Sequence, residues 1–391
     1  MTERPLRVFI CAGEQSGDSH GAALAKRLRQ RDPNIELHGL GGPLMEAAGV
    51  TLRMDFVEHA TMGIVPVLKK LPFFKRMLAE TAAYLAEWKP DVLVPIDYPG
   101  FNLRLSGRAR KRGVHVAYYV SPQVWAWRPG RIHRIARLVD HMLVLFPFEV
   151  DLYSGVGVPC TFVGHPLFDE LRTRKPSPAF RAGLGLETAT PLLGLLPGSR
   201  QAEVDKNLRL ILRAAKRVQE EMPEVRLALA LAKESLRPAI EAGLAEFPGL
   251  CVEVLPGKAS DIARVSRAAI TVSGTATLEL LHYDCPMVVV YQLTSAQAWL
   301  GKRLLTTEWI ALVNVLAQRE ICPEYVCSED VTEQVAADTL ALLRPGRARK
   351  RCLTHMANLR LKVDVKGSHE LAADTVFKLA QTVRREPSPS S

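Results

Sequence analysis

The sequence predicts an α/β protein made of two doubly wound domains, each built on a parallel sheet. Short apolar runs recur between helical segments, and they do not alternate with polar residues as half-buried strands would. Unalternating runs of this length are typical of parallel strands buried on both faces. The strand–helix pattern also restarts after a polar, proline-bearing segment, and the 391 residues exceed one typical domain.

The first domain is expected to cover residues 1–170. Its apolar runs predict strands at 6–11, 35–39, 92–96, 115–120 and 141–145. A helix is expected from Ser19 to Arg31, with basic residues in its last turns, where the negative end of the helix dipole favours them. Consecutive units of this kind build a sheet that helices cover on both faces.

A second domain is expected at residues 186–364, after a linker at 171–185 that contains Leu-Arg-Thr-Arg-Lys-Pro-Ser-Pro. Its helix is predicted at 207–221, and its strands from 192 onward and at 226–231, 251–254 and 269–272. A C-terminal helix near 365–385 is a candidate to pack back onto the first domain, and the tail 386–391 is expected to be disordered. Chains of this build hold their ligand in the cleft between the two halves.

The net charge of +10 favours an acidic partner, either a nucleic acid, an anionic membrane surface or a phosphorylated substrate. No nucleic-acid-binding motif is recognisable, so nucleic acid is the weakest of these partners. No signal peptide is expected, and no apolar run reaches the roughly 18 residues that span a bilayer. The seven cysteines include no C-x-x-C pair, which indicates reduced thiols rather than a zinc site.

The loop after the first strand, Cys11-Ala-Gly-Glu-Gln-Ser-Gly-Asp18, has the glycines of a phosphate-binding loop but no lysine or arginine. Its carboxylates, Glu14 and Asp18, would repel a phosphate, whereas they could accept hydrogen bonds from sugar hydroxyls. Ser16 lies between them. The loop is therefore predicted to line a hydroxyl-binding site.

Asp97 follows the predicted strand 92–96 directly, in Asp97-Tyr-Pro-Gly-Phe-Asn102. A carboxylate at the C-terminal edge of an open α/β sheet is placed for catalysis. The alternative is an aspartate that only forms the turn before Pro-Gly.

Two stretches of the second half have the pattern of a phosphate-binding turn. In Ser273-Gly-Thr-Ala-Thr-Leu-Glu279, small residues and hydroxyls open a helix whose free N–H groups could bind a diphosphate without a metal, and Glu279 could accept from a ribose hydroxyl. Plain helix capping with a solvent-facing glutamate is the alternative. In Pro197-Gly-Ser-Arg200, Arg200 is suited to a bidentate phosphate contact, unless it is an ordinary surface arginine.

Two further stretches combine apolar and cationic side chains. The loop 118–131 holds two tryptophans and two arginines, which suit sugars, bases and phosphates. The segment 62–78 suits an interfacial contact with an anionic membrane, and core packing with exposed lysines is the alternative. Its expected membrane-contact residues are Ile64, Val65, Leu68, Lys69, Lys70, Phe73, Phe74, Lys75 and Arg76.

Seven motifs run in order along nearly the whole chain. They are Ala12-Gly-Glu-Gln-Ser-Gly-Asp18, Gly41-Gly-Pro-Leu-Met45, Asp97-Tyr-Pro-Gly-Phe-Asn102, Tyr119-Val-Ser-Pro-Gln-Val-Trp-Ala-Trp127, Phe162-Val-Gly-His-Pro166, Leu196-Pro-Gly-Ser-Arg200 and Ser273-Gly-Thr-Ala-Thr-Leu-Glu279. With these motifs the chain resembles the lipid-A-disaccharide synthase family of glycosyltransferases.

The resemblance implies a GT-B fold, in which two Rossmann-like domains face each other across a cleft. It also implies inverting transfer from UDP-2,3-diacylglucosamine to 2,3-diacylglucosamine 1-phosphate, with UDP released and a β(1→6) bond formed. The residues that it assigns to donor binding are Ser199, Arg200, Ser273, Gly274, Thr275, Glu279, Asn314, Arg319 and Glu320. Asp97 is then the first candidate for the general base, and Glu14 and His20 are weaker ones.

No metal or other cofactor is expected, because no Asp-x-Asp site is visible. The implied location is the cytoplasm, peripheral to the inner face of the inner membrane of a Gram-negative bacterium, and a homodimer is left open. Three alternatives stand beside this interpretation: a UDP-N-acetylglucosamine 2-epimerase of the same fold, a nucleotide-sugar transferase that acts on another lipid, and a basic nucleic-acid-binding protein.

Overall fold

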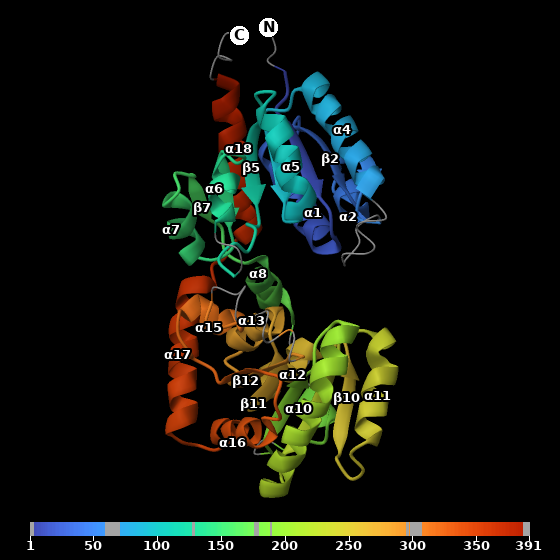
Figure 1. Cartoon of the computed structure of the whole chain (residues 1–391), viewed down its shortest axis with the longest axis vertical. Helices are drawn as coiled ribbons and strands as arrows, with labels where there is room; N and C mark the ends of the chain where they lie inside the picture. Colours follow the sequence, from blue (N-terminus) through green and yellow to red (C-terminus); the bar gives the residue numbers. More distant parts are fainter. Residues whose placement is uncertain are drawn as a thin grey trace. The chain divides into compact units, whose positions relative to one another are not determined.

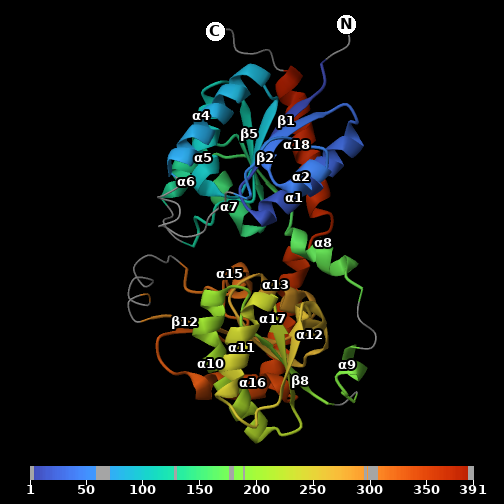
Figure 2. The same cartoon turned by 90° about the vertical axis from the view of Figure 1, so that its right-hand side faces the viewer.

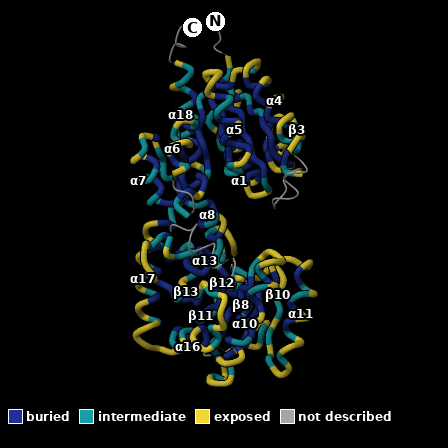
Figure 3. The backbone as a smooth tube through the Cα atoms, viewed as in Figure 1, coloured by how far each residue is buried: buried dark blue, intermediate teal, exposed yellow. Residues whose placement is uncertain are grey.

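The computed structural model describes residues 4–58, 71–126, 130–175, 180–187, 190–294, 297 and 307–385 (Figure 1). They form two compact units, Met1–Pro166 with Val365–Ser391 and Leu167–Asp364. Each unit has a parallel sheet with helices on both faces, which confirms the predicted fold class. In both units the strands are mostly buried while the helices keep an exposed side (Figure 3). The cleft predicted between the domains stays a prediction.

The sheet of the first unit has the strand order β3-β2-β1-β4-β5-β6-β7. Its strands are β1 (Arg7–Ala12), β2 (Glu36–Gly41), β3 (Thr51–Asp55), β4 (Val92–Ile96), β5 (His115–Tyr119), β6 (His141–Val144) and β7 (Cys160–Phe162). Strands β1, β4 and β5 are almost wholly buried, as expected for the centre of a parallel sheet. Strands β3 and β7, at the two edges, are more exposed and were not predicted.

Helices cover both faces of this sheet (Figure 2). They are α1 (Gln15–Arg31), α2 (Pro43–Ala47), α4 (Leu71–Trp88), α5 (Pro99–Arg110), α6 (Arg131–Ala136), α7 (Phe148–Ser154) and α18 (Ser368–Arg385). Helices α4 and α5 pack together on one face, and α1 and α18 pack together on the other.

The last helix of the chain, α18, is part of the first unit. It packs against α1, and its buried residues include Ala372, Ala373, Val376 and Ala380. Ion pairs then fix the contact at its exposed rim, where Arg31 binds both Asp374 and Glu370, and Arg27 also binds Glu370. The two ends of the sequence therefore stabilise one hydrophobic core.

The sheet of the second unit has the order β10-β9-β8-β11-β12-β13. Its strands are β8 (Leu192–Leu196), β9 (Arg226–Leu231), β10 (Val252–Pro256), β11 (Ala268–Val272), β12 (Met287–Gln292) and β13 (Glu324–Cys327). Its helices are α8 (Pro166–Thr173), α9 (Phe180–Gly183), α10 (Gln201–Glu221), the 3₁₀ turn η1 (Glu234–Leu236), α11 (Arg237–Ala245), α12 (Ala259–Val265), α13 (Thr275–His282), α15 (Leu312–Ala317), α16 (Thr332–Leu343) and α17 (Arg347–Val363).

The segment 171–185, which was predicted to be a linker, differs from that expectation. Helix α8 continues to Thr173, and α9 follows within the same segment. Leu171 and Phe180 are buried, and Arg172 forms ion pairs with Asp169 and Asp364. Polar composition suggested a tether, but two buried apolar side chains and these ion pairs hold the segment against the second unit.

Some predictions concern residues that the structure does not describe, and others it does not test. Ile64, Val65, Leu68, Lys69 and Lys70 lie outside the described residues, and so does the tail 386–391. All seven cysteines are free, as predicted. Among the helices of the described ranges, none is both long and apolar enough to cross a bilayer. The same ranges hold no cluster of three His, Cys, Asp or Glu side chains at metal-binding distances, and the need for a metal remains untested.

Candidate active site

The strand order of the first unit reverses between β1 and β4, and open α/β sheets bind ligands at such a switch point, beyond the carboxyl ends of the strands. Ala12 of β1 pairs with Ile96 of β4, so the next residues, Gly13 and Asp97, emerge side by side. A β-carbon on Gly13 would lie 2.4 Å from the ring of Tyr98, so only glycine fits here. The first loop and the Asp97 loop therefore form one site.

The backbone at Asp97 is strained and firmly held. Asp97 and Tyr98 have φ angles of 45° and 46°, in the left-handed region that non-glycine residues rarely adopt. The Asp97 carbonyl oxygen accepts hydrogen bonds from Asn102 Nδ2 at 2.8 Å and from the Tyr118 hydroxyl at 2.6 Å. These bonds stabilise a conformation that fixes where the carboxyl group of Asp97 points.

The carboxyl group of Asp97 is half-buried, and burial raises its pKa to about 6, with the nearby charge of Glu14 adding to the increase. The neighbouring N–H of Tyr98 lowers it slightly. A carboxylate with a pKa near 6 is ionised at neutral pH and is a better proton acceptor than an ordinary aspartate. The pair of acids therefore suits general-base chemistry.

Asp18 has a different role from the one predicted for it. Its side chain is 3% exposed, and its oxygens accept the backbone N–H groups of Gly42, Leu44 and Met45 at 2.8–3.1 Å. It thus binds the N-terminus of α2, where N–H groups have no partner within the helix. This contact joins two of the sequence motifs and leaves Glu14 as the acid that faces the site.

His20 lies on α1, next to two other histidines of the first unit. Its Nδ1 is 3.3 Å from Nε2 of His369, and its ring lies 6.0 Å from that of Tyr119. Burial lowers the pKa of His20 to about 3, with smaller contributions from His369 and His165. Such a histidine stays neutral and accepts a proton poorly, so Asp97 is the stronger candidate for the base. Ser16 is exposed on the first turn of α1.

Helix α7 supports the loop that follows β5, a contact that the sequence did not reveal. Val120, which begins this loop, has a φ of 63°, which is rare for a β-branched residue. Glu149 is 3% exposed, and it accepts hydrogen bonds from the hydroxyl of Ser121 and from the N–H of Phe146. Burial raises the pKa of Glu149 to about 7, although bonds from Ser121, Phe146 and Trp125 oppose this. Glu149 thus holds the beginning of the loop after β5, at Ser121.

The second unit reverses its strand order at the equivalent place, between β8 and β11. Leu196 of β8 pairs with Thr271 of β11, which brings the turns after these strands together. In the first turn Arg200 is exposed and bonds Glu203 Oε1 at 2.8 Å, while the N–H of Ser199 donates to Glu203 Oε2 at 3.0 Å. Glu203 therefore orders the turn, and the guanidinium of Arg200 remains accessible.

The turn after β11 leads into the eight-residue helix α13 (Figure 1). Gly274 has a φ of 148°, which favours glycine. Ser273 donates its hydroxyl to the carbonyl of Ile310 at 2.6 Å, and Thr277 donates back to the carbonyl of Gly274 at 2.8 Å. Thr275 is exposed at the start of the helix. The turn thus presents backbone N–H groups and one free hydroxyl.

Glu279 does not face solvent, as the capping alternative would require. It is 9% exposed, accepts a hydrogen bond from the hydroxyl of Ser260 and pairs with Arg174 at 3.2 Å. Both contacts are made with Oε1, and the contact of Glu279 with a ribose hydroxyl stays a prediction.

Asn314 is fully buried and acts within the protein rather than at its surface. Its amide oxygen accepts the N–H groups of Ile321 and Cys322, and its Nδ2 donates to Glu324 at 2.9 Å. The other oxygen of Glu324 accepts a hydrogen bond from the N–H of Ile310 at 2.6 Å. The carbonyl of the same residue, Ile310, accepts the hydroxyl of Ser273. Asn314 and Glu324 therefore connect the turn after β11 to the exposed residues Arg319 and Glu320.

The described part of the predicted membrane segment is the start of α4. Phe73 and Phe74 are half-buried against the hydrophobic core, and the ring of Phe74 lies 6.0 Å from that of Phe56. Lys75 and Arg76 are exposed. The two phenylalanines thus fit the core-packing alternative, while the two cations remain available at the surface.

Comparison with known proteins identifies the family. Residues 8–376 match the family model described as lipid-A-disaccharide synthetase. The chain belongs to this family. The lipid-A-disaccharide synthase of Myxococcus xanthus is 39% identical over 375 residues, which cover 96% of this chain and 98% of that protein. The synthase of Geobacter sulfurreducens is 38% identical over 380 residues, with coverage of 97% and 99%.

As a lipid-A-disaccharide synthase family member, the chain is a glycosyltransferase of lipid A biosynthesis, as predicted. Solved structures share its fold at low sequence identity. A UDP-GlcNAc 2-epimerase from Neisseria meningitidis, bound to UDP-GlcNAc, has a TM-score of 0.62 at 12% identity, covering 95% of this chain and 100% of that one. The glycotransferase of kitacinnamycin has a TM-score of 0.62 at 15% identity, covering 96% and 99%. These likenesses show the GT-B fold alone, so they do not support the epimerase alternative over the family match.

Proposed function

We propose that the chain transfers 2,3-diacylglucosamine from UDP to the 6-hydroxyl of 2,3-diacylglucosamine 1-phosphate, with inversion, forming a β(1→6) disaccharide and UDP. The observation that carries this proposal is Asp97, held by two hydrogen bonds at the switch point of the first unit, with a pKa raised to about 6. Family membership supports the choice of substrates, and the fold supports a nucleotide-sugar donor.

In the proposed reaction the oxygen of the acceptor hydroxyl attacks the anomeric carbon, its proton passes to the carboxylate of Asp97, and the bond from the anomeric carbon to the diphosphate breaks. A positioned general base of this kind contributes about 10²–10⁴-fold to the rate. Glu14 raises the basicity of Asp97 through its charge and is the acid proposed to bind a sugar hydroxyl. Asp18 is not proposed for this role, because it is occupied by α2.

The electron pair of the broken bond stays on UDP, so the leaving group gains negative charge. Arg200 and the N-terminus of α13 are the groups proposed to stabilise that charge, with the hydroxyl of Thr275 beside them. Arg319 and Glu320 remain proposed contacts of the donor. Asn314 is proposed to act indirectly, through the turns that it connects.

The same proposal places the protein in the cytoplasm, peripheral to the inner face of the inner membrane of a Gram-negative bacterium. Acylated substrates lie in or near a bilayer, and the exposed cations Lys75 and Arg76 of α4 would meet its anionic headgroups. No metal is proposed to take part. Assembly as a homodimer is compatible with the reaction but is not required by it.

The test is incubation of the purified chain with both acylated substrates in detergent micelles, with and without a chelator. We expect UDP and a disaccharide 1-phosphate in equal amounts, a β-anomeric coupling in the NMR spectrum of the product, and the same rate in chelator. Omission of the acceptor is the matched control and should abolish UDP release. Conversion of the donor to its 2-epimer, or UDP release without a disaccharide, would contradict the proposal.

A further inference from the structure

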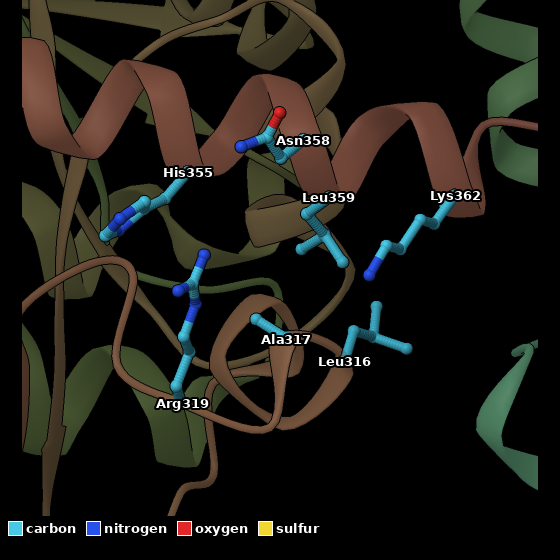
Figure 4. A pocket seen from close by; sticks show the side chains of 7 residues that line it. All are labelled: Leu316, Ala317, Arg319, His355, Asn358, Leu359 and Lys362. Carbon is cyan, nitrogen blue, oxygen red and sulfur yellow. The ribbon is translucent and has the colours of Figure 1, made fainter.

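A hollow of about 340 Å³ lies in the second unit between the C-terminal end of α15 and one side of α17. Leu316, Ala317 and Leu359 give it an apolar floor, and its polar lining comes from Arg319, His355, Asn358 and Lys362. Figure 4 shows the side chains of Arg319, His355 and Lys362 directed into the space between the two elements. No residue of the turns at Pro197–Arg200 or Ser273–Thr275 lines it, and of its described lining residues only Arg319 is also a proposed donor contact.

The hollow is lined by cations without a counter-charge. No carboxylate is among its lining residues. Across the described part of the chain, neither Arg319 nor Lys362 forms an ion pair or a side-chain hydrogen bond, whereas Arg349 and Arg360 of α17 do. Burial lowers the pKa of His355, and the positive charges of Arg319 and Arg351 lower it further. These groups therefore repel one another in the unliganded protein, and an anion would relieve that repulsion.

Helix α17 is strongly cationic, with its positive charges near its two ends. It has six lysines and arginines and no acidic residue, and four of the six fall within its first five residues. Cations at a helix N-terminus oppose the helix dipole and destabilise the helix. These four cations lie outside the hollow, whereas Lys362 in the last turn of the helix lines it. The exposed face of the helix also carries Leu361, which is 85% exposed.

We propose that the hollow between α15 and α17 binds the phosphate group of an organic phosphate ester. Arg319 offers a bidentate fork, Lys362 a point charge, and His355 a further donor, which together suit a group of charge near −2. The space exceeds that of a phosphate ion, and its apolar floor fits the carbon part of an ester. The phosphate can belong to a small soluble ester or to a lipid headgroup, which bind through the same contacts.

The soluble source is tested by calorimetry with glycerol 3-phosphate at fixed ionic strength, on the full chain with and without saturating UDP, because Arg319 is also a proposed donor contact. Binding that UDP abolishes would place the phosphate in the donor site and overturn the proposal. The variant is Lys362→Glu, and the matched control is Lys350→Glu, which makes the same charge change on the exposed face of the same helix but outside the hollow. We expect Lys362→Glu to weaken binding at least tenfold, as loss of one charge-assisted hydrogen bond does. We expect Lys350→Glu to weaken it less than about threefold, because salt screens the more distant charge.

The lipid source is tested by sedimentation of the same proteins with vesicles of phosphatidylglycerol in phosphatidylcholine. If Lys362→Glu binds vesicles more weakly than Lys350→Glu does, the phosphate belongs to a lipid headgroup. If Lys362→Glu binds glycerol 3-phosphate more weakly than Lys350→Glu does, the phosphate belongs to a soluble ester. The proposal is overturned if neither ligand distinguishes Lys362→Glu from Lys350→Glu, since binding would then reflect only the general charge of the helix. Circular dichroism confirms that both variants fold. A separate titration of each variant with UDP reports on the proposed donor site.

Discussion

The two units place opposite chemistry at equivalent positions. In both sheets the strand order reverses at the central pair, β1 and β4 in one and β8 and β11 in the other. The first unit presents two acids at that point, Glu14 and Asp97, and the backbone of Asp97 is strained. The second presents a guanidinium, a glycine turn and a helix N-terminus. One topology thus offers a proton acceptor in the first unit and an anion-binding site in the second.

The comparison teaches that the fold fixes where a site forms and the loop residues fix what it does. In each unit a glutamate supports the loops: the buried Glu149 in the first unit and the half-buried Glu324 in the second. Burial raises the pKa of both carboxyl groups. These two residues make it possible to disturb one site and leave the other intact.

The largest effect is expected from Asp97→Asn. The variant removes the proton acceptor but keeps the shape of the side chain, so kcat should fall about 10²–10⁴-fold while UDP binds as before. Steady-state kinetics and UDP calorimetry measure the two quantities. A kcat within threefold of the unmodified protein would show that Asp97 is not the base.

Arg200→Ala tests the second unit in the same way. Loss of a charge-assisted contact to the diphosphate should weaken UDP binding about 10- to 100-fold. Arg209→Ala is the matched control, since Arg209 lies on the same helix and forms an ion pair with Glu246. Equal UDP affinity in the two variants would remove Arg200 from the donor site.

The supporting glutamates should separate the two sites. Removing the acceptor of a buried hydrogen bond costs about 1–3 kcal/mol, so each alanine variant should lose about tenfold in one property. Glu149→Ala should raise the KM of the acceptor, and Glu324→Ala should raise the Kd of UDP. Partial recovery with glutamine is expected in both. If either variant changed both properties equally, the two sites would not be independent.

The smallest effect is a shift in pH dependence. Because the base must be ionised, kcat/KM should decline by about tenfold per pH unit below the pKa of about 6 for Asp97. Glu14→Gln removes a charge that raises this pKa, so the decline should begin at lower pH, by less than one unit. A pH–rate profile that is flat between pH 5 and 7 would contradict the assignment of Asp97.

Much of the fold could be predicted from the sequence, because central parallel strands are continuous apolar runs. The strands at 92–96 and 226–231 have the predicted bounds. The edge strands β3, β7 and β13 were missed, since partial exposure makes them short and mixed in composition. The strand β12 was also missed, although its run Met-Val-Val-Val is a clear signal.

The candidate site shows a different limit. The sequence indicated Asp97 from its place after a strand, and the structure adds the strain and the acid beside it. The sequence did not reveal that Asp18 binds the N-terminus of α2, because that contact joins residues that are 24 to 27 positions apart. The predicted helix start at Ser19 was also wrong. Glycines suggested a loop, but Gly17 lies inside α1, where a β-carbon would come within 3.3 Å of Ala12.

The return of α18 to the first unit has a consequence for synthesis on the ribosome. The first unit is translated early, but the helix that covers its α1 face is among the last segments to be made. Until then the side of α1 that packs against α18 remains uncovered, so the first unit completes its folding only after the second has emerged. A nascent chain that stalls before residue 368 would therefore expose an aggregation-prone apolar surface, although its entire N-terminal sheet has already been translated. Such a chain would depend on a chaperone.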